Sequence, residues 1–218
     1  MKIQINRSAA HTGSQEGLSA LATVKLSPER QQQLELAEVA SGGSASWRGR
    51  KHAEVWDLLA LSQLAPAGRL AVEFLDLRTA LRAAVRLRVP VPCMPQPGGE
   101  LFVAGSALLG ITYRQQALSQ PQPGVAFIQI LSPLRVWHAN VAMDSVQPLC
   151  LGAQLPAGIR IKELLLAAYG ALSMQAVMID PDDPAGVLNR GAARWWQSNL
   201  TRLPLSRIPF LGEEDGQS

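Results

Sequence analysis

One cysteine in the last third of the chain stands among residues that could support acyl transfer. Cys150 comes after His138 and Asn140 in a stretch that contains prolines. A thiolate can accept an acyl group as a thioester, and a nearby amide can donate a hydrogen bond to the oxyanion that forms. The order of these residues indicates a cysteine held in an irregular loop, with an amide side chain near it.

Each of these side chains also has a structural interpretation. Cys150 can be a small buried apolar residue, as cysteines outside disulfides often are. Asn140 can hold a turn through its own backbone, or it can donate to an oxyanion. His138 can act as a general base toward the thiol, or it can bond backbone groups and fix the loop. The residue types leave these alternatives open.

An acidic stretch follows, in which prolines flank Asp180, Asp182 and Asp183. It can be a solvated turn that caps the next helix. If it lies beside Cys150, its carboxylates could orient or deprotonate an incoming amine. The other cysteine, Cys93, has prolines and apolar residues around it, so we expect it in the core.

The composition and the short motifs argue against several classes of function. The 218 residues are 47% apolar and carry a formal charge of +3. Mild basicity spread along the chain does not indicate nucleic acid, and Arg82, Arg86 and Arg88 predict a solvated face. Two cysteines make no disulfide framework, and no Cys/His group has zinc-ligand spacing. No glycine-rich phosphate loop is present. We therefore expect no metal and no cofactor.

The chain start lacks the apolar core of a signal peptide. The longest apolar stretch, residues 164–172, is too short to span a bilayer. These features predict a cytoplasmic protein without a membrane partner, in a compartment where a thiol stays reduced.

The pattern of elements predicts an α+β fold. Residues 1–46 predict a partly flexible N-terminal extension, with a short helix from Ser27 and Pro28 to about Val39. Residues 47–218 predict the main domain. It begins with a helix to Leu64 and continues with strands near residues 70–75, 85–91, 108–113 and 125–130. An irregular segment, residues 133–158, is followed by helices over 161–172 and from about Asn189 through Leu200. Segregated helices and strands favour a four-stranded antiparallel meander.

The stretch from Pro133 to Leu211 resembles the C-terminal half of a ubiquitin-conjugating enzyme. That family has a His-Pro-Asn tripeptide, a catalytic Cys-Leu, an apolar helix, an acidic loop ending in Leu-Asn, and a helix with Ala-Ala. In the same order this chain has His138-Ala139-Asn140, Cys150-Leu151, residues 161–172, residues 180–184, Leu188-Asn189 and Ala192-Ala193. Residues 121–128 also resemble the proline-rich approach to that family's fourth strand.

The resemblance implies a ubiquitin-conjugating-enzyme-like fold and a thioester mechanism. Cys150 would accept the C-terminal carboxylate of a ubiquitin-like protein from an ATP-dependent activating enzyme. It would then pass the acyl group to an amine of a protein target. Asn140 would organise the loop or stabilise the oxyanion, His138 would be structural, and the loop of Asp180, Asp182 and Asp183 would flank the thioester.

The chain also departs from the common pattern of that family. Alanine replaces proline at position 139, the gap from Asn140 to Cys150 is longer, and residues 185–187 extend the acidic loop. These departures resemble bacterial relatives from ubiquitin-like conjugation operons, some of which serve antiphage defence. Two other functions remain open. One is a catalytically inactive adaptor with the same fold, since fold does not fix chemistry. The other is a hydrolase that pairs Cys150 with His138.

Overall fold

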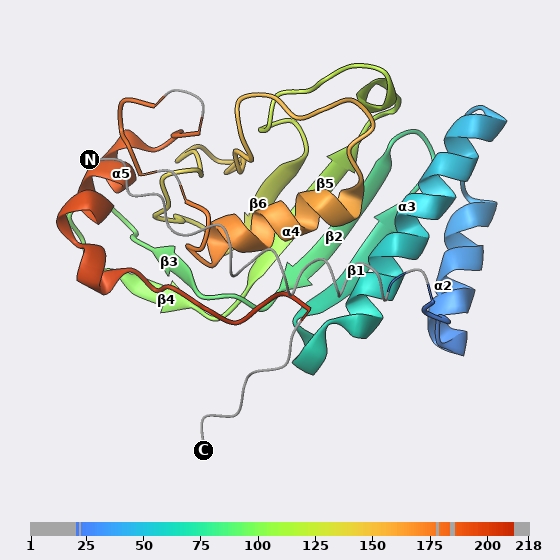
Figure 1. Cartoon of the computed structure of the whole chain (residues 1–218), viewed down its shortest axis with the longest axis horizontal. Coiled ribbons are helices and arrows are strands. Elements are labelled where there is room, and N and C mark those ends of the chain that lie inside the picture. Colours follow the sequence, from blue (N-terminus) through green and yellow to red (C-terminus); the bar gives the residue numbers. More distant parts are fainter. Residues whose placement is uncertain (1–20, 22, 178, 184–185, 212–218) are drawn as a thin grey trace.

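An antiparallel sheet forms the centre of the structure, a computed structural model that describes residues 21, 23–177, 179–183 and 186–211 (Figure 1). Its four strands, in their order across the sheet, are β1 (Leu70–Asp76), β2 (Leu81–Leu87), β5 (Ala107–Tyr113) and β6 (Ile128–Ser132). The predicted α+β fold with a four-stranded antiparallel meander is confirmed at this level. The predicted bounds are less accurate, because the second strand ends at Leu87 and the fourth begins at Ile128.

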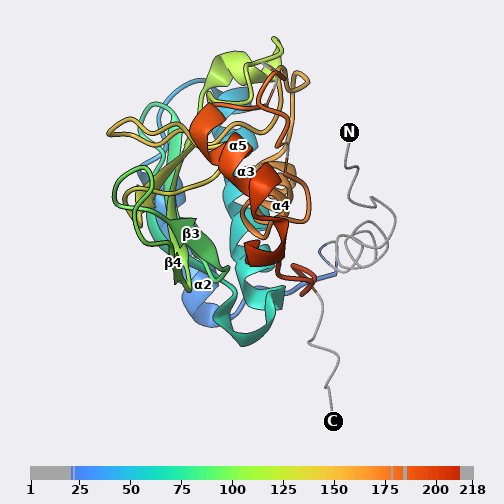
Figure 2. The same cartoon turned by 90° about the vertical axis from the view of Figure 1, so that its left-hand side faces the viewer.

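Only one face of this sheet is buried. Along β2, Ala83 and Val85 are buried, whereas Arg82 and Arg86, which flank this pair along the strand, are exposed. Helices α3 (Ala45–Leu64) and α4 (Ile161–Leu172) pack against each other on the buried side (Figure 1, Figure 2). The three arginines predicted on a solvated face are all exposed: Arg82, Arg86 and Arg88.

A short hairpin, β3 (Val91–Cys93) with β4 (Phe102–Ala104), was not predicted from the sequence. Strands of three residues are too short to show an alternating pattern, and prolines interrupt this region. The hairpin continues through a bridge between Cys93 and Val136. It therefore extends the fold toward the segment that carries His138.

The N-terminal helix α2 (Pro28–Val39) packs on α3 (Figure 1). Its predicted start is confirmed, because the Ser27 side chain accepts from the Arg30 N–H and Pro28 is the first helical residue. Arg30 also donates to the Leu59 carbonyl of α3 at 3.0 Å. The division expected at residue 46 stays a prediction, and residues 1–20 and 22 lie outside the described residues.

A buried ionic network fixes the start of α4, whose predicted bounds are confirmed. The fully buried Glu54 of α3 accepts from the Ile161 N–H at 2.7 Å, and its other oxygen lies 2.6 Å from Nε of Arg50 and of Arg160. Arg50 also donates to the Gly158 carbonyl at 2.8 Å. These contacts fix the end of the irregular segment that contains Cys150.

The last helix, α5 (Arg190–Ser198), begins where predicted, with the Asn189 side chain accepting from the Ala192 N–H. Its predicted extent was wrong. The helix ends at Ser198, and Leu200 lies in the following 3₁₀ turn η3 (Leu200–Arg202), where it is 42% exposed. No helix among the described residues is both long and apolar enough to cross a membrane.

Candidate functional site

A hydrogen bond between their backbones joins Asn140 and Cys150. The chain folds back on itself between them, with a bridge between Val141 and Leu149, and the Cys150 N–H donates to the Asn140 carbonyl at 2.8 Å. A second bridge, from Pro148 to Gln129, attaches this turn to β6. The sheet therefore brings together two residues that are separated along the sequence.

His138 is fully buried and both of its ring nitrogens are engaged. Nδ1 accepts from the Asn140 N–H at 3.1 Å, and Nε2 lies 3.0 Å from the Ala171 carbonyl at the end of α4. This pattern requires the neutral ring with its proton on Nε2. Burial lowers the pKa of His138 to about 4, which keeps the ring neutral at pH 7. In this arrangement neither nitrogen can accept a proton from Cys150.

Asn140 connects the cysteine turn to the acidic loop. Its side-chain Nδ2 donates to the Gly186 carbonyl at 2.6 Å. The Ala139 carbonyl accepts from the N–H groups of both Leu188 and Asn189 at 2.9 Å. The tripeptide around Asn140 thus holds the end of the loop that precedes α5. The Asn140 amide nitrogen is used for this contact, while its Oδ1 is buried with no hydrogen-bond partner among the described residues.

The Cys150 thiol is nearly covered. The residue is 6% exposed, and Sγ lies 3.4 Å from the Gly152 carbonyl. Gly152 has φ +132°, a conformation that favours glycine. A Cβ atom on Gly124 would lie 2.2 Å from the Gly152 carbonyl oxygen, so the two glycines permit a close backbone approach. The sequence hypothesis did not identify this pair, although glycine after a Cys-Leu dipeptide is the signal that could have done so.

The three aspartates of the acidic loop turn the loop itself. Asp180 Oδ1 accepts from the Asp182 N–H at 3.1 Å, and the Asp180 carbonyl accepts from the Asp183 N–H at 3.1 Å. Asp180 and Asp182 are exposed and Asp183 is half-buried. One of the two interpretations predicted a turn here, and the turn is present, but these aspartates do not cap α5, whose N-cap is Asn189. The loop is connected to Cys150 indirectly: Gly186 bonds the Asn140 side chain, and the Asn140 carbonyl accepts from the Cys150 N–H.

A cluster of buried apolar residues packs between α5 and the segment that carries His138 and Asn140. Its buried members are Met94, Trp137, Ala139, Met174, Ile179, Val187, Ala192, Ala193 and Trp196. The indole N–H of Trp196 donates to the Trp137 carbonyl at 3.0 Å, next to His138. This cluster joins α5 to the tripeptide. In the described part of the chain, no three His, Cys, Asp or Glu side chains come together as metal ligands would.

Comparisons with protein-family models, curated proteins and solved structures found no match for this chain. The functional interpretation therefore depends on the order of residues in the sequence and on the geometry of this site.

Proposed function

We propose that this chain is a ubiquitin-like-protein conjugating enzyme, which carries the modifier as a thioester on Cys150. The observation that carries the proposal is the joint position of three sequence motifs. The Cys150 N–H bonds the Asn140 carbonyl, and the Asn140 side chain bonds Gly186 of the acidic loop. One residue, Asn140, thus links the backbone of the proposed nucleophile to the end of the acidic loop.

The proposed reaction has two acyl transfers. The Cys150 thiolate attacks the carbonyl carbon of the modifier's thioester on the activating enzyme. A new C–S bond forms, and the activating enzyme's thiolate leaves. An amine of the target then attacks the same carbonyl. A C–N bond forms, Cys150 leaves as the thiolate, and the amine proton passes to solvent or to a carboxylate. ATP is consumed only by the activating enzyme.

The residues of this chain would act mainly by position. His138 is neutral and engaged on both nitrogens, so the buried ring fixes the turn and does not act as a base. Asn140 holds the acidic loop near the turn. Catalysis would then depend on holding the thioester and the amine in productive geometry. Both transfers require the Cys150 Sγ to move away from the Gly152 carbonyl, and glycine at position 152 permits such a movement.

The second candidate is a catalytically inactive adaptor of the same fold, which binds an activating enzyme or a ubiquitin-like protein. The low exposure of Cys150 favours it, because a covered thiol does not exchange acyl groups. The predicted pairing of Cys150 with His138 in a hydrolase is disfavoured, because both His138 nitrogens bond backbone groups.

A charging assay on non-reducing gels separates the two candidates. The purified chain is mixed with ATP, an activating enzyme and the ubiquitin-like protein that this enzyme activates. An enzyme gives a shifted band that reductant removes and that Cys150→Ala lacks. If the activating enzyme charges itself but this chain gives no band, while co-purification shows binding, the chain is the adaptor.

A further inference from the structure

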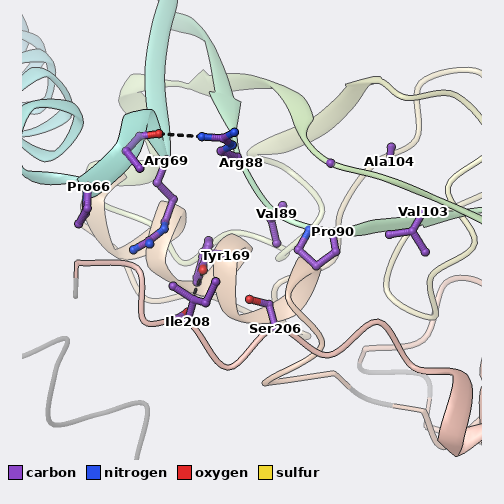
Figure 3. Close-up of a pocket in the computed structure, with 12 residues that line it drawn as sticks. Pro66, Arg69, Arg88, Val89, Pro90, Val103, Ala104, Tyr169, Ser206 and Ile208 are labelled. Atoms are coloured by element: carbon purple, nitrogen blue, oxygen red, sulfur yellow. Dashed lines mark hydrogen bonds between the residues drawn. The ribbon is translucent and has the colours of Figure 1, made fainter. Parts of the chain in front are cut away.

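A cavity of about 620 Å³ lies away from the cysteine turn, between the β3–β4 hairpin, α4 and the chain after η3 (Figure 3). Its walls are mostly apolar, with Val89, Pro90, Val103 and Ile208 among the lining residues. This volume is in the range of pockets that hold ligands. The proposed conjugating activity gives this cavity no role.

One wall is a segment of chain, residues 206–210, that is held by hydrogen bonds from neighbouring side chains. The Tyr169 hydroxyl donates to the Ile208 carbonyl at 2.8 Å, and Gln175 Nε2 donates to the Ser206 carbonyl at 2.6 Å. Arg69 donates to the Phe210 carbonyl at 3.0 Å, and the rings of Phe210 and Tyr169 pack with centroids 5.1 Å apart. The wall is therefore formed before any ligand binds.

The opposite wall contains an open strand edge. In antiparallel pairs, residues alternate between those bonded to the partner strand and those that point away. Val103 of β4 faces Pro92, which has no N–H and whose carbonyl accepts from the Trp137 N–H at 2.7 Å on the other side. The Val103 N–H and C=O therefore point away from β3. No described residue supplies a hydrogen bond to them.

A cation, Arg88, and an exposed apolar residue, Val103, both line the cavity. Arg88 lines the cavity and is exposed. Its guanidinium donates to the Ala67 carbonyl at 3.1 Å, and no described carboxylate pairs with it. Phe102 and Val103 are each 47% exposed on β4. By contrast Arg86, two residues earlier, is paired with Glu73 at 2.6 Å and does not line the cavity.

We propose that this cavity binds an extended acidic peptide segment of a partner protein, which adds as a third strand to the edge of β4. The main chain of the peptide bonds the N–H and C=O of Val103. One apolar side chain fills the cavity, and an Asp or Glu side chain pairs with Arg88. Peptides that add to a sheet edge gain affinity from the main chain and specificity from side-chain pockets. The open edge favours a peptide over a small carboxylate, and Arg88, which pairs with no described carboxylate, favours an acidic peptide.

A displayed library of random ~10-residue peptides tests the site. The library is first depleted on the full-length Val103→Pro variant and then selected on the full-length wild-type chain. Proline at 103 removes the open N–H, and edge strands tolerate proline where the N–H faces solvent. The enriched peptides should alternate β-branched or aromatic residues with polar ones and contain Asp or Glu.

Synthetic versions of the enriched peptides are then measured by fluorescence anisotropy. We expect Val103→Pro and Arg88→Gln each to weaken binding by about tenfold or more, and the matched variant Arg86→Gln by less than about twofold. N-methylation of alternate peptide amides should remove binding. Thermal unfolding checks that every variant is folded. The proposal is overturned if no peptide is enriched, or if the enriched peptides bind both cavity variants as well as wild type. Neither outcome depends on charging at Cys150.

Discussion

The two cysteines of this chain are both buried, but in different elements of the structure. Cys93 lies in strand β3, is fully buried, and burial raises the pKa of its thiol to about 11. Cys150 lies in an irregular turn between β6 and α4, where its thiol faces the carbonyl of a glycine with positive φ. Both residues have prolines nearby in the sequence. The difference therefore comes from the element that holds each cysteine: a strand fixes one in the core, and a loop places the other beside the carbonyl of Gly152.

The largest expected difference between the two is in thiol alkylation. A thiol reacts as the thiolate, and at pH 8 a thiol with pKa about 11 is ionised to roughly one part in a thousand. Cys93 also requires an opening of the strand before any reagent reaches it. We expect iodoacetamide to modify Cys150 faster than Cys93 in the native protein, by about tenfold or more, because the Cys93 thiol is scarcely ionised and is held in a strand. Peptide mapping by mass spectrometry measures both rates, and similar rates would remove the contrast.

The next largest expected effect is a pH dependence of the free energy of unfolding, which comes from His138 in the segment that carries the Cys150 turn. Burial lowers the pKa of His138 to about 4 in the folded chain, from an ordinary value of 6.5. The unfolded chain therefore binds the proton more tightly. The stabilisation is fully present above about pH 6.5 and is lost as the pH falls toward 4, by on the order of 3 kcal/mol.

Urea unfolding between pH 4 and pH 7 measures this dependence. The His138→Gln variant should lose that part of the slope. His52 is the matched control, because it is 40% exposed on α3 and lies far from the turn in the sequence. The assignment to His138 is wrong if His52→Gln flattens the curve and His138→Gln does not.

The Asn140→Ala substitution is expected to have a smaller effect, on the rate at which the thioester is discharged to an amine. Alanine there removes the bond to Gly186 and releases the acidic loop, while the backbone bond to Cys150 remains. We expect discharge to an amine to slow by about tenfold or more and charging by less than about twofold. Single-turnover assays of the two steps test this, with Asn199→Ala as a variant outside the turn. Equal losses in both steps would assign the amide a purely structural role.

Much of the fold could be predicted because its elements are long and periodic. Helix α3 has a helical spacing of apolar residues, α4 is a nearly continuous apolar run, and the alternation predicted over residues 85–91 overlaps the end of β2. The hairpin of β3 and β4 has too few residues for such a pattern. The end of α5 was placed too late, because Leu200 continues the helical spacing after the helix has ended.

For the candidate site, the sequence proposes residues, and those assignments stay predictions; it does not predict their contacts. The order of residues indicated His138, Asn140 and Cys150 as candidates. It does not show that the Asn140 amide donates to the Gly186 carbonyl. Nor does it show that the Cys150 sulfur faces Gly152, because that contact depends on the close approach of Gly124. Such contacts are set by backbone conformation and packing in a loop, where spacing gives no period to follow.

The most direct test is intact-mass measurement of the protein after it has been mixed with ATP, an activating enzyme and the ubiquitin-like protein that this enzyme activates. We expect the wild type and Cys93→Ala to gain the mass of the modifier less one water. Reductant should remove this mass, and Cys150→Ala should not gain it. An adduct that persists in Cys150→Ala, or that is lost in Cys93→Ala while that variant is folded, would contradict the assignment of Cys150 as the acyl carrier.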